Sequence, residues 1–598
     1  MNNRKHLSAL SLLPAALLVV VLSLGSIFAS AGAEASAASV TISPFAGTPT
    51  AMPQTQISFL GASARALSAI SVVGSVSGRH SGHLRSYASA AGASFLPSKP
   101  FTPGEKVTVH AHWSVGTRTR SLSTYFTVAH PVAPPSMKFP SVPGTPADVQ
   151  GFQSRPDLRP PVVTVNQASA QVASGYVFAA PFMGPGAYGP MIFDNTGRLV
   201  WFHPLPTGQD AADLKVQSYR GERNLTWWQG KTIMLGYGLG EDVIANTSYK
   251  TVAVVKAGNG LPTDEHEFTV LPNGAALITA YSPVQANLSS AGGPSSGVAV
   301  DCAVQEIDIH TGLVMWEWHS LGHVDVSQSY SKPPAAPNGY YDYFHVNSVQ
   351  QLKEGNFLIS ARNTWGAYEL NAHTGQITWQ LGGKRSTFKL GPGVQFAYQH
   401  HVRMLPNGQI SVFDDEGAPT IHAPTRGEFI KLDTKAKSAT LAGQLVRGSG
   451  PLITGSQGDV QALPDGNWML GWGGLPNLTE FNSRGQIVYD AQFPKGEMSY
   501  RVYREPWSAQ PSEAPAIAAR ASGATSTVYA SWNGATNVAS WQLLSGTSAG
   551  HMTPVATTPD SGFETTIPAP AAPFVQVRAL SSSDKVLGTS KAIQPASR

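Results

Sequence analysis

Three histidine segments and one arginine stand at comparable places in a repeated strand pattern. His266 lies in DEHEFTVLPNG, His345 in YDYFHVNSV, and the pair His400-His401 in FAYQHHVRMLPNG, while Arg362 ends the strand NFLISAR. Each histidine leads into a strand of similar text, and equivalent positions of successive repeats converge when repeats surround an axis. Imidazoles and a guanidinium gathered in this way would form a cationic pocket that contains a nucleophile. That is the chemistry expected for moving an anionic group.

Each of these residues also has a structural interpretation. A histidine entering a strand is more often a hydrogen-bonded structural residue, and a strand-end arginine such as Arg362 is ordinarily a solvated charge. Asn347 follows His345 by two positions, so both side chains face the same side if this segment is extended. His400 and His401 would then face opposite sides, with one in the pocket and the other structural. The coincidence of three histidines at the same point of the repeat favours the functional interpretation.

A run of carboxylates, Asp414, Asp415 and Glu416, follows the strand after the histidine pair. Such a run offers a calcium site or a partner for a histidine. A polar turn is the more ordinary interpretation, and we prefer it.

The middle of the chain repeats two alternating hairpins. One hairpin carries the texts FTVLPNGAALITAY, VQQLKEGNFLISAR, VRMLPNGQISVFDD and VQALPDGNWMLGWG, and the other carries texts such as YELNAHTGQITWQL. Two hairpins make a four-stranded sheet of roughly 50 to 60 residues, which is the size of a propeller blade. With two weaker units upstream, the sequence predicts an all-β fold whose centre is a six-bladed β-propeller over residues 162–507. An insertion at 322–341 is expected to lie over the site.

The flanking regions have different patterns. The chain has 598 residues with 59 Gly and 45 Pro, which favours several domains rich in strands and turns. Residues 40–130 predict an N-terminal Ig-like β-sandwich, residues 131–161 form a Pro-rich linker, and residues 511–598 resemble a C-terminal fibronectin type III-like β-sandwich.

The net charge indicates which partners to expect, and the N-terminal segment indicates where the protein is located. A formal charge of +4 is small for this length and argues against a dedicated nucleic-acid binder. Residues 1–36 read as a signal peptide, with Arg4 and Lys5 before an apolar run and small residues after it. We therefore expect an exported protein, secreted or at the cell surface, with an uncleaved membrane anchor as the alternative. The flanking sandwiches would offer contacts to the cell surface or cell wall.

The combined motifs resemble the arylsulfotransferase family of exported bacterial β-propellers. The resemblance covers roughly residues 140–505 and rests on DEHEF, DCAVQEIDIHTG with MWEWHSLGHV, YDYFHVNSV, LISAR with TGQITWQLGGK, and FAYQHHVR. It implies a six-bladed propeller that moves sulfate from a small-molecule aryl sulfate to a phenol through a sulfated histidine. It also implies that the enzyme uses no nucleotide sulfate donor, and the scheme requires no cofactor and no metal.

The same resemblance assigns roles to residues of this chain. It makes His400 the nucleophile, because His400 follows the glutamine of an F-x-x-QH pattern. His266, His345 and Arg362 would be catalytic neighbours, and Asn347 and His401 would bind substrate. His401 departs from the family pattern, where a different polar residue often stands, so the choice of nucleophile between His400 and His401 stays open.

Two other classes of function fit a propeller. A propeller between sandwich domains could be a non-catalytic extracellular module that binds a ligand or glycan. The T-G-x-x-x-W text at 311–316 and 374–379 also occurs in quinone-dependent dehydrogenases, but six blades and a histidine-arginine centre favour that hypothesis less.

Overall fold

The computed structural model describes residues 40–136, 139–422, 424–448 and 450–597. The predicted signal peptide at residues 1–36 lies outside the described residues. Within the described ranges, no helix has the length and apolar character needed to cross a membrane.

Strands dominate the described chain. Its only helices are three short 3-10 turns: η1 (Pro146–Asp148), η2 (Ser289–Ala291) and η3 (Val326–Gln328). The prediction of an all-β fold is confirmed.

The N-terminal region has two sheets around one apolar core. One sheet has the order β1 (Thr41–Ser43), β3 (Ile57–Leu60), β7 (Gly92–Pro97) and β6 (Gly82–Ser86). The other has the order β2 (Thr48–Ala51), β9 (Arg118–Val128), β8 (Lys106–Val115), β4 (Leu67–Gly74) and β5 (Gly78–His80). Val107, Val109 and Ala111 alternate with polar residues along β8 and lie in the core, as the period of a half-buried strand requires.

The C-terminal region is built in the same way. One sheet has the order β43 (Glu564–Pro570), β40 (Thr525–Ser531), β39 (Ala516–Ser522) and β46 (Ala596–Ser597). The other has the order β42 (His551–Pro559), β41 (Ser540–Ser548), β44 (Phe574–Leu580) and β45 (Val586–Thr589). Val528, Trp541 and Ile567 belong to the core that the two sheets share.

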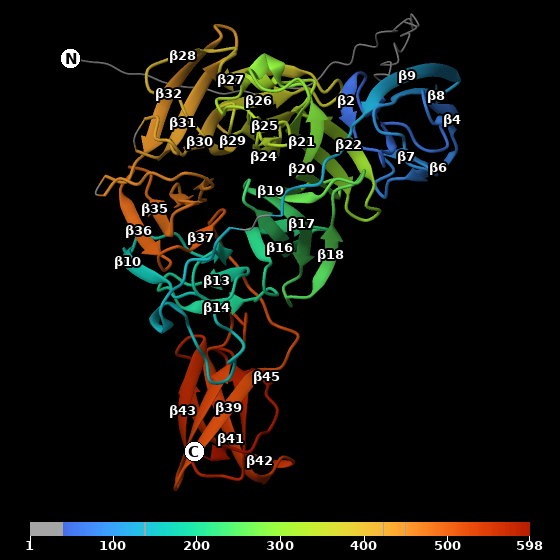
Figure 1. Ribbon diagram of the computed structural model, residues 1–598. Helices are drawn as coiled ribbons and strands as arrows, with labels where there is room; N and C mark the ends of the chain where they lie inside the picture. Colours follow the sequence, from blue (N-terminus) through green and yellow to red (C-terminus); the bar gives the residue numbers. More distant parts are fainter. Residues whose placement is uncertain (1–39, 137–138, 423, 449, 598) are drawn as a thin grey trace, which may run out of the picture. The chain divides into compact units, whose positions relative to one another are not determined.

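Between these regions, antiparallel strands follow one another in chain order (Figure 1). The first sets are β11 (Tyr176–Ala179), β13 (Met191–Phe193) and β14 (Leu199–Phe202); β15 (Asp210–Tyr219), β16 (Glu222–Ile233), β17 (Tyr237–Ala245) and β18 (Thr251–Val255); and β19 (Thr263–Val270), β20 (Ala275–Ala286), β21 (Gly297–Asp308) and β22 (Val314–His319). The later sets are β24 (Val346–Gln351), β25 (Phe357–Ala361), β26 (Gly366–Leu370) and β27 (Ile377–Gly382); β29 (His400–Met404), β30 (Gln409–Asp414), β31 (Arg426–Asp433) and β32 (Ser438–Leu445); and β33 (Asp459–Ala462), β34 (Trp468–Gly471), β35 (Asn477–Phe481) and β36 (Ile487–Gln492). The remaining strands are β10 (Thr164–Ala168), β12 (Pro181–Phe182), β23 (Tyr340–Tyr341), β28 (Lys389–Leu390), β37 (Met498–Ser499) and β38 (Tyr503–Glu505).

The end of this middle region pairs with its beginning. Strand β38 is antiparallel to β11, with Phe178 opposite Tyr503, and β10 is antiparallel to β36. Strands β12 and β37 add a further pair between the same two parts of the chain. The succession of sheets is therefore closed by strands from both ends of the region.

The four repeated sequence segments that contain a glycine turn form β-hairpins, as predicted. Their turn glycines, Gly274, Gly355, Gly408 and Gly466, have φ values of +81°, +92°, +79° and +90°. Only glycine adopts this left-handed conformation without a steric cost, which explains why each text carries glycine at this point.

A buried arginine on the returning segment joins several of these sheets. Arg501 donates from Nη1 to Asp213 Oδ1 on β15 at 3.0 Å, and from Nη2 to the carbonyl oxygens of His266 and Asn347, both at 2.9 Å. Its side chain has no exposed surface. One guanidinium therefore fixes β15, β19 and β24 relative to the end of the region.

Glu267 completes this ion network. It accepts from Arg403 at 2.6 Å and lies 3.3 Å from both Lys215 and Arg501. Burial alone would raise the pKa of Glu267, but Arg403, Arg501 and Lys215 hold it well below its ordinary value. The carboxylate therefore stays ionised among three cations.

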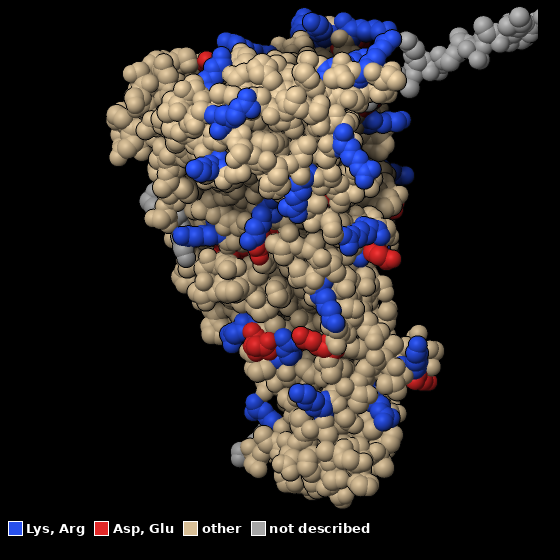
Figure 2. Space-filling model, turned by 90° about the vertical axis from the view of Figure 1, so that its right-hand side faces the viewer, with Lys and Arg blue, Asp and Glu red and all other residues tan. Residues whose placement is uncertain are grey.

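The surface carries few charges. Figure 2 shows Lys and Arg side chains scattered over one face and separated by uncharged surface, with Asp and Glu near only some of them. This agrees with a composition in which 13% of residues are charged.

Replacing Arg501 with methionine should lower the free energy of unfolding by about 3–5 kcal/mol, because it leaves buried carboxylates without their cation. A urea titration followed by tryptophan fluorescence measures this loss. Lys256→Met is the control, since Lys256 pairs with Glu241 at 3.0 Å with its side chain 67% exposed, where water screens the pair. Equal losses in the two variants would contradict the structural role of Arg501.

Candidate active site

Four of the predicted site residues line one cavity. His266, His345, Arg362 and His400 all face a cavity of about 430 Å³. They come from β19, the residue before β24, the residue after β25 and the start of β29. The structure thus brings together side chains that lie up to 134 positions apart in the sequence, from 266 to 400.

The predicted insertion also reaches this cavity. Ser331, Lys332, Tyr340 and Tyr341 belong to residues 322–341 and contribute to its lining. The insertion therefore forms part of the cavity wall, as the sequence predicted.

Aromatic rings pack between the histidines. The rings of His266 and His345 are 5.0 Å apart and nearly perpendicular. Tyr500 lies 5.2 Å from His266 and 6.4 Å from His400, measured between ring centroids, and Tyr281 lies within 5.5 Å of both His266 and His345. The histidines are almost completely buried and meet solvent only through the cavity.

Each cavity histidine is held by its own carboxylate. The Nδ1 atoms contact Asp264 (2.7 Å from His266), Asp415 (2.8 Å from His400) and Asp342 (beside His345). A carboxylate on one ring nitrogen fixes the orientation of the ring and the position of its proton. In this arrangement Nδ1 is occupied, and Nε2 is the nitrogen left for chemistry.

His400 shows which of its nitrogens carries the proton. The backbone N–H of Gln457 donates to His400 Nε2 at 3.3 Å, so Nε2 has a lone pair and Nδ1 carries the hydrogen. That hydrogen is donated to Asp415. Burial raises the pKa of Asp415, and the charge of Arg362 opposes this shift.

Electrostatics keep the His400 ring neutral. Burial lowers its pKa well below the ordinary value, and the charges of Arg362, His266 and His345 lower it further. Burial also lowers the pKa of His345, despite Asp342. A neutral imidazole with an unprotonated Nε2 is a nucleophile.

Arg362 provides a cation at the same cavity. It donates from Nη1 to Asn363 Oδ1 at 2.9 Å and from Nη2 to the carbonyl of Gly455 at 2.8 Å, and it lies 4.6 Å over the ring of Tyr398. Among the described residues it forms no ion pair. A guanidinium that is fixed in place without a paired carboxylate is suited to bind two oxygens of an anion.

The other two predicted residues do not line the cavity. Asn347 is buried and donates to the carbonyl of Gln399 at 2.7 Å. Its neighbour His345 has φ +60°, so the extended segment assumed for this pair is absent. His401 has φ +49°, and its Nδ1 accepts from the N–H of Val460 at 3.3 Å. His400 and His401 therefore point to different surroundings.

The preferred interpretation of Asp414, Asp415 and Glu416 as a polar turn is wrong. All three are buried. Asp414 pairs with Arg426 at 3.0 Å, and Asp415 holds His400. No three or more His, Cys, Asp and Glu side chains are arranged to hold a metal ion in the part of the chain that the structure describes.

Sequence reasoning missed two of the three aspartates that hold the histidines, and it offered Asp415 only as the less favoured alternative. Two of them had a local signal, because Asp264 precedes His266 by two positions and Asp342 precedes His345 by three. Asp415 is 15 positions from His400 and is brought back by the β29–β30 hairpin, in which His400 lies opposite Phe413.

Comparison with known families adds independent information. Residues 215–494 match the family model described as Arylsulfotransferase (ASST). No curated protein matches the chain.

Solved structures show only distant similarity. A protein of unknown function from Bacteroides caccae is 14% identical with a TM-score of 0.34, and the match covers 55% of this chain and 98% of that one. A protein from Lactobacillus plantarum is 12% identical with a TM-score of 0.31, covering 66% and 100%. A virginiamycin B lyase from Staphylococcus aureus is 10% identical with a TM-score of 0.27, covering 64% and 95%. At these TM-scores the similarities carry no argument.

The His400 ring should stay neutral, with its proton on Nδ1, as the pH falls through about 6.5, where an unperturbed histidine is half protonated. The direction follows from its lowered pKa, because protonation then needs a more acidic solution. NMR of ¹⁵N-histidine-labelled protein reports both the charge and the tautomer, and a His400→Gln spectrum identifies the signal. Asp415→Asn should shift the proton towards Nε2, because an amide N–H can donate to Nδ1. An ordinary titration near pH 6.5 in the native protein would contradict this account.

Proposed function

Over residues 215–494 the chain belongs to the arylsulfotransferase family, and from this premise we propose that it transfers a sulfuryl group from an aryl sulfate ester to a phenolic acceptor. The observation that carries the proposal is His400, whose Nε2 is unprotonated beside Arg362 in one cavity. The transfer would use no nucleotide donor and would proceed by double displacement through a sulfohistidine.

In the first half-reaction, the hydrogen bond from the Gln457 N–H to His400 Nε2 breaks, and the freed lone pair of Nε2 attacks the sulfur of the aryl sulfate. The N–S bond forms as the bond from sulfur to the phenolic oxygen breaks, and the phenoxide leaves. Arg362 binds sulfuryl oxygens and stabilises the charge that they carry in the transition state. Asp415 accepts the Nδ1 hydrogen bond, which strengthens as the ring becomes positive.

A second histidine carries the proton. We assign this role to His266, because its partner Asp264 stays ionised: burial alone would raise the pKa of Asp264, but His266 and hydrogen bonds hold it below its ordinary value. His266 gives a proton to the departing phenoxide. In the second half-reaction it takes the proton of the acceptor phenol, whose oxygen attacks sulfur and releases His400.

The architecture supports a six-bladed propeller for residues 162–507. In this proposal the strand sets that begin with β15, β19, β24, β29 and β33 are five blades, and β11, β13 and β14 with β38 form the sixth. We infer an Ig-like domain for residues 40–130 and a fibronectin type III-like domain for residues 511–598. We also propose that the protein is exported and is either secreted or held at the cell surface. A non-catalytic binding module is the alternative, and it predicts no turnover of a chromogenic aryl sulfate.

His400 should become covalently sulfated when an aryl sulfate is supplied without an acceptor. Intact-mass analysis followed by peptide mapping measures the addition of one sulfuryl group. His400→Ala should lose both the adduct and donor cleavage, whereas His401→Ala should keep the adduct, because His401 lies outside the cavity. An adduct on His401 would reverse the assignment, and transfer without any adduct would replace double displacement with direct transfer.

Arg362→Ala should lower turnover of aryl sulfates about a hundredfold or more, since it removes a donor from the developing charge. We expect a similar direction for His345→Ala. Arg385→Ala is the matched control, because Arg385 is exposed and lies outside the cavity. Steady-state kinetics together with circular dichroism separate a lost contact from misfolding. Normal turnover in both Arg362→Ala and His345→Ala would mean that these residues are structural.

A further inference from the structure

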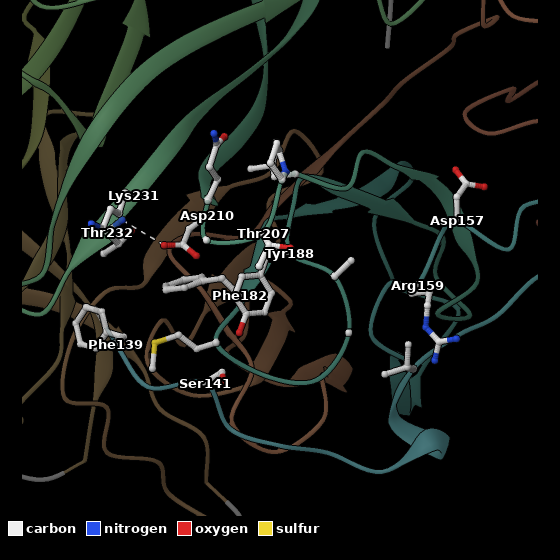
Figure 3. Close-up of a pocket in the computed structure, with 18 residues that line it drawn as sticks. Phe139, Ser141, Asp157, Arg159, Phe182, Tyr188, Thr207, Asp210, Lys231 and Thr232 are labelled. Atoms are coloured by element: carbon white, nitrogen blue, oxygen red, sulfur yellow. Dashed lines mark hydrogen bonds between the residues drawn. The ribbon is translucent and has the colours of Figure 1, made fainter. Parts of the chain in front are cut away.

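A second cavity adjoins the candidate active site. It has a volume of about 660 Å³ and shares Phe139 and Thr232 with the histidine cavity. The wall between the two is held by Thr232, whose hydroxyl donates to Glu265, a residue of the histidine cavity, and whose N–H donates to Asp210 Oδ2 at 3.2 Å. Figure 3 shows Asp210 directed at Thr232.

Aromatic and apolar side chains line much of this second cavity. Phe139, Phe182 and Tyr188 contribute rings, with Met183 and Leu205 beside them in the lining. In Figure 3 the three labelled rings lie on the side of Thr232, while Asp157 and Arg159 lie apart from them. A volume of this size and an aromatic wall suit an organic molecule with one or more rings.

The linker, residues 131–161, forms one wall of the second cavity and is hydrogen-bonded to the segment that follows β12. Val142 donates its N–H to the carbonyl of Met183 at 2.6 Å, and Ala187 donates to the carbonyl of Arg159 at 2.8 Å. The cavity therefore exists because residues of the linker pack against β12 and the segment that follows it.

Two cations of the lining offer contacts to an anionic group on the ligand. Asp157 is paired with Arg155 at 2.7 Å, and Asp210 accepts from Thr232. Arg159 and Lys231 also line the cavity, and neither forms an ion pair with any residue in the described ranges. Two cations without a paired carboxylate attract a carboxylate or sulfate.

We propose that the second cavity binds the aromatic body of the phenolic acceptor, and that the preferred acceptor has two or more rings and an anionic substituent. The inference rests on the proposed function, since it supplies the acceptor of that reaction. The hydroxyl would enter the histidine cavity past Phe139 and Thr232. While His400 carries the sulfuryl group in the cavity of about 430 Å³, the second cavity gives the rings of a larger acceptor a place to bind.

Binding is tested first without any transfer. Isothermal titration calorimetry measures a hydroxynaphthoate against His400→Ala protein, which cannot form the sulfohistidine. The double variant with Thr207→Trp should weaken binding about tenfold or more, because Thr207 is exposed and lines only the second cavity, so that an indole there fills the space. Thr119→Trp, at an exposed position of β9, is the control and should bind as the parent does.

Two further variants test the charge. Arg159→Gln and Lys231→Gln should weaken hydroxynaphthoate binding and leave naphthol binding unchanged. In transfer assays, Thr207→Trp should raise the KM for hydroxynaphthoate more than the KM for phenol. The two glutamine variants keep the proposal testable if Thr207→Trp fails to fold.

The outcomes separate the two proposals. If hydroxynaphthoate does not bind, or binds equally to all variants, the acceptor cavity is wrong even where transfer occurs. If binding is lost in Thr207→Trp while the native protein transfers no sulfuryl group, the cavity stands as an aromatic site and the transferase function falls.

Discussion

The site depends on a single buried guanidinium. Arg501 joins β15, β19 and β24 through Asp213 and the backbone carbonyls of His266 and Asn347. A buried cation is tolerated only where carboxylates and carbonyls surround it, so the sheets must approach closely at this point. His266 lies on β19 and His345 directly precedes β24, so Arg501 fixes the positions of these two cavity histidines. His400 starts β29, which is tied to the same network through Arg403 and Glu267.

The carboxylate beside each cavity histidine determines which ring nitrogen is available for chemistry. Three aspartates occupy the Nδ1 atoms of His266, His345 and His400, which leaves Nε2 as the chemical atom in every case. The rings nevertheless differ, because burial and neighbouring cations depress the pKa of His400 and Asp264 is ionised beside His266. A nucleophile and a proton carrier can thus be made from the same residue type by changing only the surroundings.

The sequence predicted most of what depends on local patterns. The repeated hairpin sequences located the strands, because glycine is needed at φ near +80° in each turn. The common position of the histidines in those sequences located three cavity residues, and the strand end located Arg362. Asp415 could not be found in this way, since its contact with His400 is made across a hairpin. Asn347 was placed by assuming an extended segment, and the left-handed backbone at His345 removes that premise. No local sequence pattern identified Arg501, because the residues that it joins, from Asn347 to Asp213, lie 154 to 288 positions away.

The pairing of β11 with β38 also sets how far the chain must extend before the candidate site is complete. Strand β11 pairs with β38, which ends at Glu505, and Arg501 lies just before β38 in the sequence. A chain that ends before this segment has neither the closing strand nor the cation that contacts the His266 carbonyl. The candidate site is therefore complete only in a chain that extends through Glu505.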